Sequence, residues 1–503
     1  MIDALIAGPL LLPAFAGTAT LLFWLRYRWI GAIISIGSIT GLVALAITLM
    51  VRAASGEVIA YALGDWPAPF GIVLVLDRLS ALMLLLTALL GLAVAVHATL
   101  TGLDRKGWHF HALFQFQLLG VNGAFLTGDL FNLFVFFEVL LIASYGLMLH
   151  GQGARRLTAG VQYVIVNLIG STLFLIALGL LYGVTGTLNM ADMAARAAAL
   201  PAGDQGLLRA GGLLLTVVFG LKAALLPLHL WLPRTYAAAA PAVAALFAIM
   251  TKVGAYAIIR TVPLIFGDGA GMFLLPAALG TMLVGFVGLL AARGLGDLAA
   301  FALIGSTATL LTAIALFDEP GMAAALYYLP HTTISAALLF LTVDLIVRWR
   351  GVEGGAIVPT PHYKGQGWLG FQFLAVGVAL VGLPPLSGFI GKLLILQAAA
   401  ASPYMAAIWV MVLGTSLLGL IGLARAGSTL FWKADASPPI ANDRAAPRAL
   451  EALPACFLLA LLAAFTVLAG PITAYMEATS TQIFNTADYV RSVLGSEEGR
   501  VGR

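Results

Sequence analysis

Long apolar windows are the feature of this 503-residue chain that most restricts its fold. A helix needs about 20 apolar residues to cross a hydrocarbon core roughly 30 Å thick. Windows of that length recur along most of the chain, and only 10% of its residues are charged, where soluble domains have about a quarter. The pattern therefore predicts an all-α integral membrane protein, because a helix satisfies its own backbone polar groups inside lipid.

The apolar windows predict about fourteen transmembrane helices. Their expected extents are 4–25, 30–51, 79–100, 109–128, 130–149, 161–184, 211–233, 241–262, 271–292, 297–316, 322–347, 369–400, 404–424 and 451–476. So few residues lie between them that we expect residues 1–503 to form a single polytopic domain in a lipid bilayer, without a soluble catalytic domain. The first window lacks a basic segment and a small-residue cleavage site, so we expect a retained span rather than a signal peptide.

The loops between the windows indicate an orientation. When alternate loops are assigned to the same side, one side carries roughly fifteen Lys and Arg residues and the other roughly eight. Basic loops stay on the cytoplasmic side, so both chain termini are predicted on the outer side. Because these basic residues lie at helix ends, they give no reason to expect a nucleic-acid partner.

The sequence gives no sign of a cofactor or a metal. Cys456 is the only cysteine, which excludes a disulfide framework and a cysteine-based metal or cluster site. Neither a dinucleotide fingerprint nor a P-loop, HExxH motif or nucleophile elbow occurs. We therefore expect this chain alone to bind no cofactor and no metal.

Two predicted spans are interrupted by their own prolines. The seventh contains Pro227 and Pro233 in LKAALLPLHLWLPR, and the twelfth contains Pro384 and Pro385 in VGLPPLSGFIGKLLIL. Proline removes a backbone donor and clashes with the carbonyl one turn back, so each span should unwind or kink there. Non-helical backbone at membrane depth persists only where protein or a watery cavity satisfies it. Two interrupted spans about five helices apart, each with a lysine, are typical of a transporter built from two inverted repeats.

Five ionisable residues lie near span centres, where a charge costs about 2.5 to 3.5 kcal/mol on insertion scales. They are Glu138, Lys222, Lys252, His331 and Lys392. A charge near a span end, such as that of Asp77, His229 or Asp344, can pair with a neighbour or reach the interface for structural reasons alone. The central set has three lysines and one carboxylate, so pairing cannot explain all of it, and we interpret it as functional. For His331 the residues alone leave a structural and a functional interpretation open.

A buried lysine has the chemistry that a proton relay needs. Desolvation lowers the pKa of a lysine and a nearby carboxylate raises it again. A lysine whose partner approaches and withdraws can therefore load and release a proton near neutral pH. Glu138 is the expected partner of Lys222, and their titrations should be coupled. Histidine needs less perturbation, because its ordinary pKa is about 6.5.

Seven further polar side chains are expected at membrane depth. They could line a chain of waters, or they could form hydrogen bonds between helices. These residues are Gln115, Gln117, Asn122, Asn167, Ser171, Ser306 and Thr307.

Four segments of the chain resemble a known family. They are GDLFNLFVFFEVLLIASYGL, GLKAALLPLHLWLPRTYAAAAPAVAALFAIMTKVGAYAI, YYLPHTTISAALLFL and GLPPLSGFIGKLLIL. They resemble the proton-antiporter-like subunits shared by respiratory complex I, membrane-bound hydrogenases and Mrp-type cation/proton antiporters. The length and the lysine in the twelfth span are most similar to the D subunits of Mrp-type Na⁺/H⁺ antiporters.

This resemblance implies two inverted five-helix repeats, roughly spans 4–8 (residues 109–262) and spans 9–13 (residues 271–430). It implies a hydrated polar axis along the membrane midplane. In that axis Glu138 would be the fifth-span glutamate, and Lys222, Lys252 and Lys392 the lysines of the seventh, eighth and twelfth spans. His331 would be the polar relay of the second half. The family further implies a bacterial inner-membrane protein that works with other membrane subunits, and moves protons inward to drive Na⁺ or another monovalent cation outward.

Two other functions compete with that of a transporter subunit. The chain could be the proton-pumping membrane subunit of an NADH:quinone oxidoreductase or a hydrogenase, and so part of an enzyme. It could also be a membrane scaffold whose lysines merely pair with other subunits. The sequence distinguishes none of these by itself, and it does not show which cation is exchanged.

Overall fold

The computed structural model describes residues 3–23, 28–201, 203–267, 269–351, 354–363, 365–433 and 448–495. In that part of the chain, 12 helices are long and apolar enough to cross a membrane. The predicted helical membrane class is therefore confirmed, while the count of about fourteen spans stays a prediction. Parts of the expected domain 1–503, including residues 24 and 25 of the first expected span, lie outside the described ranges.

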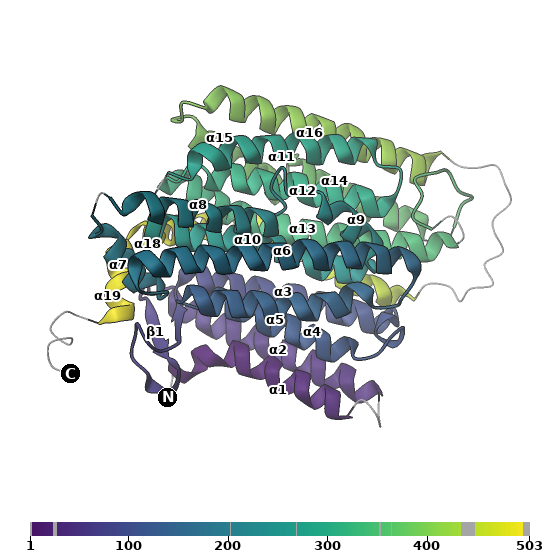
Figure 1. Ribbon diagram of the computed structural model, residues 1–503. Coiled ribbons are helices and arrows are strands. Elements are labelled where there is room, and N and C mark those ends of the chain that lie inside the picture. The colour runs from purple at the N-terminus through teal and green to yellow at the C-terminus, as the bar shows by residue number, and fades with distance from the viewer. Residues whose placement is uncertain are drawn as a thin grey trace.

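The helices follow the apolar windows closely along the chain (Figure 1). The first group is α1 (Gly8–Phe23), α2 (Arg28–Ala53), α3 (Arg78–Leu100), α4 (Phe110–Leu126), α5 (Leu130–Leu149), α6 (Ala154–Thr185), α8 (Gln205–Lys222), α9 (Trp231–Ala238) and α10 (Pro241–Thr261). The second group is α11 (Gly271–Ala291), α12 (Leu295–Ile314), α13 (Glu319–Arg350), α14 (Gln366–Val381), α15 (Ser387–Ala399), α16 (Met405–Gly427), α17 (Leu453–Val467) and α18 (Ala469–Phe484).

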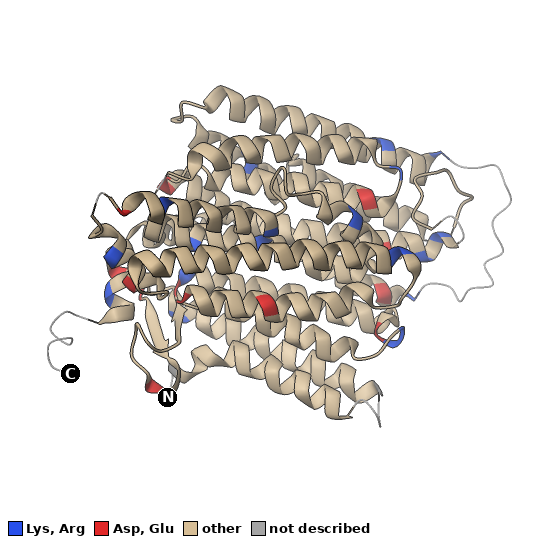
Figure 2. Cartoon of the chain, in the orientation of Figure 1, with Lys and Arg blue, Asp and Glu red and all other residues tan. Residues whose placement is uncertain are grey.

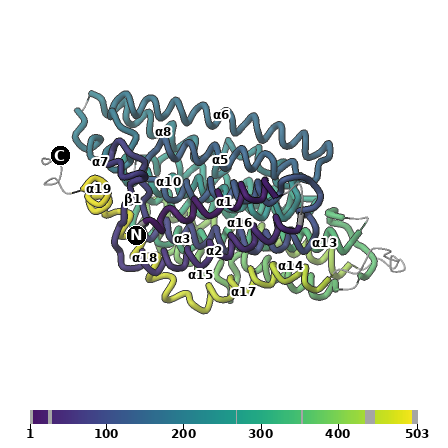
Figure 3. Tube along the Cα trace, turned by 90° about the horizontal axis from the view of Figure 1, so that it is seen from below, coloured from purple at the N-terminus to yellow at the C-terminus, as the bar shows by residue number. Residues whose placement is uncertain are grey.

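Three helices, α10, α12 and α13, form the centre of the bundle. The most apolar part of α10 is 100% buried, and those of α12 and α13 are each 89% buried. Around them the other helices run roughly parallel or antiparallel (Figures 1 and 3). Most charged residues lie at the two ends of the bundle, and only a few lie near its middle (Figure 2). A charge near the middle of one of these central helices therefore cannot reach the membrane surface by extending its side chain.

The two predicted helix interruptions are present. One separates α8, which ends at Lys222, from α9, and the other separates α14 from α15. The freed backbone groups find protein partners, as membrane depth requires. The amide of Leu226 donates to Thr281 Oγ1 on α11 at 2.7 Å, and Trp231 Nε1 donates to the carbonyl of Leu221 at 3.1 Å. Pro233 lies in the first turn of α9 rather than in the gap, where its missing N–H costs little.

The order of helices is similar in the two parts of the chain that were expected to be repeats. Both α6 and α13 have 32 residues, and each is followed by an interrupted span. The helix that follows each interrupted span continues into a five-residue π-helical turn. This turn is η4 (Val262–Phe266) after α10 and η6 (Ser428–Trp432) after α16.

Short elements at one end of the bundle were not predicted. Strands β1 (Ile59–Ala62) and β2 (Val73–Leu76) form an antiparallel hairpin, so the fold is not purely α-helical. Helices α7 (Met190–Ala198) and α19 (Thr486–Leu494) lie at the same end, together with the 3₁₀ turn η1 (Asp3–Ala7). Four-residue strands and nine-residue helices are too short to give a clear periodic pattern in the sequence. Both described chain ends therefore lie on the same side of the bundle.

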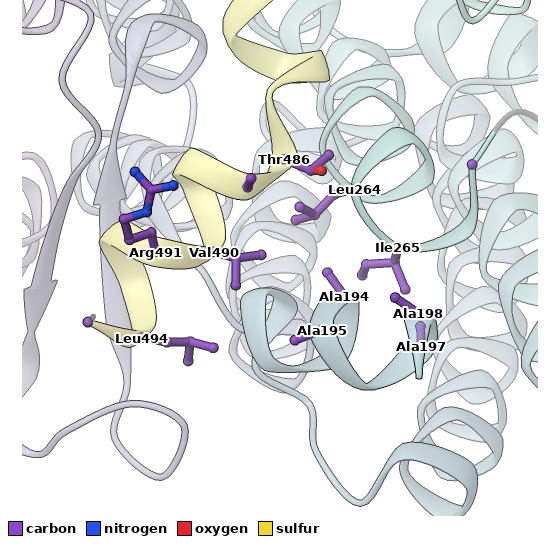
Figure 4. A pocket seen from close by; sticks show the side chains of 13 residues that line it. Ala194, Ala195, Ala197, Ala198, Leu264, Ile265, Thr486, Val490, Arg491 and Leu494 are labelled. Atoms are coloured by element: carbon purple, nitrogen blue, oxygen red, sulfur yellow. The ribbon is translucent and has the colours of Figure 1, made fainter. Parts of the chain in front are cut away.

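A pocket of about 720 Å³ lies between α7, η4 and α19 (Figure 4). Its lining consists mostly of alanine and other aliphatic side chains, with Thr486 and Arg491 on α19. None of the five ionisable residues from the span centres lines it. Its position at the end of the bundle separates it from the site described next.

Candidate functional site

Glu138 and Lys222 lie near each other in the first half of the chain, and α6 lies against both. Lys222 is the last residue of α8 and is only 6% exposed. Its ammonium donates to Asn167 Oδ1 at 2.9 Å and lies 5.7 Å from the centre of the Phe137 ring. Glu138 accepts a hydrogen bond from the hydroxyl of Ser171. In the described part of the chain, no direct ion pair joins Glu138 to Lys222, so their predicted coupling stays a prediction.

Lys392 lies at the second helix interruption. It is on α15 and 5% exposed, and its ammonium donates to the carbonyl of Val381, the last residue of α14, at 2.8 Å. It also donates to Ser416 Oγ on α16 at 2.7 Å. The carboxyl end of a helix carries a partial negative charge that favours a cation. Both interrupted spans therefore place a lysine at the carboxyl end of their first helix, and Lys392 and Ser416 line a cavity of about 340 Å³.

Lys252 occupies the centre of the bundle. It lies on α10, is 0% exposed, and donates to Thr307 Oγ1 on α12 at 3.0 Å and to Thr251 Oγ1 at 3.3 Å. Beside Thr307 on α12, Ser306 accepts a hydrogen bond from the hydroxyl of Thr332 on α13 at 2.8 Å. Hydroxyl groups thus surround a lysine that has no carboxylate bound to it among the described residues.

His331 connects α13 to the second interrupted span. It is 0% exposed, and its Nδ1 lies 2.9 Å from Ser387 Oγ, at the start of α15. Gly388 allows this approach, because a Cβ there would clash with the carbonyl oxygen of Ala379 and would lie 2.8 Å from His331 Nε2. Only glycine lets the backbone of α15 come so close to α14 and α13.

The five predicted residues lie in two groups. Asn167 and Ser171 on α6 bind Lys222 and Glu138. In the second group, Lys252 binds Thr307, the neighbouring Ser306 binds Thr332 next to His331, and His331 contacts Ser387 on α15, the helix that carries Lys392. The groups meet where α8 packs against α10. A Cβ built on Gly254 would lie 3.1 Å from the Cβ of Lys222.

Asp77 and Asp344, two of the three charges named near span ends, have the structural partners expected of them, whereas Nδ1 of His229 is buried without a hydrogen-bond partner among the described residues. Asp77 forms a buried ion pair with Arg260, whose Nη1 lies 2.5 Å from Asp77 Oδ2. Burial alone would raise the pKa of Asp77, but Arg260 and the hydrogen bonds from Ser80 outweigh it and hold this pKa below its ordinary value. Asp344 lies 2.8 Å from His97 Nε2.

Six of the seven additional polar residues at membrane depth divide into two kinds, and the seventh, Gln117, is buried without a side-chain hydrogen-bond partner among the described residues. Gln115 binds Ser35 and Ser38 on α2, and Asn122 donates to the carbonyl of Pro9 on α1. These are hydrogen bonds between helices. By contrast, Asn167, Ser171 and Thr307 contact central ionisable groups, and Ser306 binds Thr332 next to His331.

Three further residues, Thr251, Ser387 and Ser416, contact the central groups and were not predicted from the sequence. The signal that could have found Ser387 and Ser416 is a hydroxyl within an apolar or proline-broken span close to a lysine, but many serines in membrane helices bond only to their own backbone.

Fold and site together define a polytopic membrane protein with two interrupted helices and with buried ionisable and hydroxyl side chains in its interior. Residues 127–419 match the family described as NADH:quinone oxidoreductase/Mrp antiporter, TM. The chain belongs to this family.

Similar proteins cover almost the whole chain. The D subunit of a probable K⁺/H⁺ antiporter from Rhizobium meliloti is 39% identical, over 98% of this chain and 98% of its own length. The D subunit of an Na⁺/H⁺ antiporter from Alkalihalophilus pseudofirmus is 35% identical, over 97% of this chain and 99% of its own length. A chain in the solved Mrp complex from Dietzia sp. has the same fold, with a TM-score of 0.87 and 27% identity, over 98% of this chain and 99% of that one. The resemblance recognised in the sequence is thereby confirmed.

Proposed function

We propose that this chain is the proton-translocating subunit of a multisubunit monovalent cation/proton antiporter in a bacterial inner membrane. The observation that carries the proposal is the state of the three central lysines, which are at most 6% exposed and bind amide, hydroxyl or carbonyl oxygens. A lysine held by uncharged partners can lose its proton at far less cost than one fixed in an ion pair. The names of the relatives, as K⁺/H⁺ and Na⁺/H⁺ antiporter subunits, support the same class.

The proposed proton path follows the order Glu138, Lys222, Lys252, His331 and Lys392. Asn167 and Ser171 hold the first two groups, and three hydroxyls on α12 and α13 bridge the middle of the path. The cavity beside Lys392 and Ser416 leaves room for water at its end. Energy comes from the membrane gradient, because one charge moved through 100 mV is worth about 2.3 kcal/mol.

The repeats and the orientation are part of the same proposal. We propose that residues 109–262 and 271–430 are the two inverted repeats, supported by the matching order of helix lengths and of π-helical turns. We also propose that both termini face outward. Because η1 and α19 lie at the same end of the bundle, the chain should cross the membrane an even number of times. The distribution of Lys and Arg supports the outer side for both termini.

Other membrane subunits are the proposed partners, and α5 supports this. Glu138 is only half-buried, and it lies on a face of α5 where Phe131, Val135 and Ile142 are 51%, 39% and 65% exposed. A carboxylate that faces hydrocarbon is costly. We propose that a neighbouring subunit covers this face in the assembled complex.

Ion exchange in vesicles tests the proposal. Glu138→Ala, Lys222→Ala and Lys392→Ala should each abolish the fluorescent pH response to a Na⁺ or K⁺ pulse while the complex still assembles. Lys106→Ala, at an exposed loop lysine, is the matched control and should keep full exchange. Full exchange in all three site variants would contradict the relay and would favour a scaffold.

A second candidate, a proton-pumping subunit of a redox complex, is favoured by the family description, which includes NADH:quinone oxidoreductase. The proteins that co-purify with the chain separate the two candidates. Flavin and iron–sulfur proteins would favour the redox complex, whereas other membrane subunits alone would favour the antiporter.

A further inference from the structure

Asn167 and Ser171 lie one helical turn apart on α6, and each holds one member of the Glu138 and Lys222 pair. Residues four apart on a helix project from the same face. On this face of α6, Ser171 therefore holds the carboxylate of Glu138, and Asn167, one turn away, holds the ammonium of Lys222. The side chains of Asn167 and Ser171 are both buried.

The amide of Asn167 is fixed in one orientation. Its Nδ2 donates to the carbonyl of Tyr163, one turn back on α6, at 2.8 Å. Its Oδ1 must then face the Lys222 ammonium, which lies 2.9 Å away. An amide oxygen accepts a hydrogen bond from a protonated or a neutral amine, and it does not take the proton. A carboxylate in its place would bind mainly the charged form.

The second half of the chain has a comparable arrangement. α13 has the same length as α6, and His331 near its middle contacts Ser387 on the interrupted span. Asn167 near the middle of α6 contacts Lys222 on the other interrupted span. In each half, one polar side chain on the 32-residue helix thus contacts the interrupted span next to its break.

We propose that Asn167 is a positioning residue, which holds Lys222 apart from Glu138 between proton transfers and is the first-half counterpart of His331. This inference rests on the proposed function. It assigns Asn167 no proton of its own. Lys222 would leave the amide to meet Glu138 when it is loaded, and return to it when the carboxylate is neutral.

The pH profile of exchange tests the proposal in vesicles that hold the complete complex. Asn167→Asp places a carboxylate beside Lys222, and an opposite charge at this distance raises the pKa of an amine by about 1 to 3 pH units. The alkaline limb of the profile should therefore move up by about one unit or more. Asn167→Leu removes the acceptor and should lower the exchange rate about tenfold at every pH, because the buried ammonium of Lys222 loses its hydrogen-bond partner.

Asn122→Leu is the matched control, since Asn122 is a buried asparagine whose amide binds only the backbone of Pro9. It should keep the wild-type profile. If Asn167 only supports packing, Asn167→Asp will change the amount of assembled complex and leave the pH profile unmoved, and Asn167→Leu will keep the wild-type exchange rate per assembled complex; this result overturns the proposal. Should Asn167→Asp fail to assemble, Asn167→His replaces it. This variant should add a limb near the ordinary histidine pKa of about 6.5, and an unchanged profile overturns the proposal equally.

Lys222→Ala in the same vesicles separates the two levels of inference. Full exchange by Lys222→Ala removes the proposed function itself. If Lys222→Ala is inactive but Asn167→Asp keeps the wild-type pH profile, the proposed function is retained and the role of Asn167 is excluded.

Discussion

Lys252 Nζ lies 3.0 Å from Thr307 Oγ1, and this hydrogen bond joins the two parts of the chain proposed as repeats. Lys252 belongs to α10, the last helix of the first part, and Thr307 belongs to α12 in the second. Both side chains are at most 1% exposed. Any proton that crosses between the two parts along the proposed path must pass this contact.

Loss of the Thr307 hydroxyl should slow exchange. In Thr307→Val the side chain keeps its shape, but the buried ammonium of Lys252 loses its nearest acceptor, at a cost of about 1 to 3 kcal/mol. We expect the rate of cation/proton exchange in vesicles to fall about 5- to 150-fold, since 1.4 kcal/mol corresponds to one factor of ten. Thr312→Val is the control on the same helix, because Thr312 bonds only to the carbonyl of Ala308. Equal rates for both variants would remove Thr307 from the path.

Close packing of α8 against α10 should be necessary at Gly254. A Cβ there would lie 2.6 Å from the carbonyl oxygen of Phe219 and 2.8 Å from the amide nitrogen of Ala223, beside Lys222. Backbone atoms cannot move aside cheaply, and overpacking costs about 1 to 3 kcal/mol. Gly254→Ala should therefore lower both the melting temperature in detergent and the exchange rate.

Gly179→Ala provides the comparison for Gly254. It lies on α6, where an added Cβ meets no atom within 4 Å, and an alanine in a helix is favoured over glycine by about 0.5 to 1 kcal/mol. The two substitutions should thus have opposite signs in a thermal unfolding experiment. A stabilised Gly254→Ala would mean that the two helices are not in close contact at Lys222.

The fold was predictable where the physical signal is strong and local. Long apolar windows give the helices, because lipid demands a satisfied backbone over about 20 residues. Pro227 and Pro384 give the interruptions, because proline is unfavourable in a helix interior. Proline alone does not decide the matter, since Pro13, Pro276 and Pro330 lie inside the continuous helices α1, α11 and α13. The hairpin and the helices α7 and α19 were missed, since each is too short for its period to stand out.

The burial of the three central lysines and of His331 could be predicted, but their hydrogen-bond partners could not. Glu138, Lys222, Lys252, His331 and Lys392 were identified because a charge at membrane depth is costly. Their contacts depend on which helix faces which, and local periodicity does not carry that information. The carboxylate of Glu138 was the expected partner of Lys222, whereas the structure places Asn167 there, 55 residues away in the sequence. The buried pair of Asp77 and Arg260 joins residues 183 apart.

The Asp77–Arg260 pair should contribute to stability and not to exchange. The folded-state pKa of Asp77 is lowered. The contribution of the Asp77 charge to stability is therefore fully present above the ordinary aspartate pKa of 3.8 and is lost as the pH falls below it. The pair therefore stays charged across the neutral range. Asp77→Asn leaves Arg260 buried without its counter-charge, and breaking a buried pair in this way costs about 3 to 5 kcal/mol. We expect a lower melting temperature, with an unchanged pH profile for whatever complex remains assembled.

The double variant Asp77→Asn/Arg260→Met tests the origin of that loss. Removing both charges avoids an uncompensated guanidinium, so the double variant should be more stable than Asp77→Asn alone. A double variant that is less stable by the sum of both single effects would show that the two residues act independently.

Asp129 should show the opposite dependence on pH. It caps α5 by accepting from the amide of Asn132 at 2.8 Å, and burial raises its pKa although this hydrogen bond opposes the shift. A raised folded-state pKa means that its contribution is fully present below 3.8 and is lost as the pH rises through the folded value. Asparagine caps a helix about as well as aspartate. Asp129→Asn should therefore equal or exceed the wild type in melting temperature at pH 7, and the difference should shrink as the pH falls toward 4.

Asp318→Asn is the matched exchange at the exposed cap of α13, and its smaller desolvation should give a smaller change at pH 7. A clear destabilisation by Asp129→Asn at pH 7 would show that the charge at the start of α5 is stabilising rather than costly.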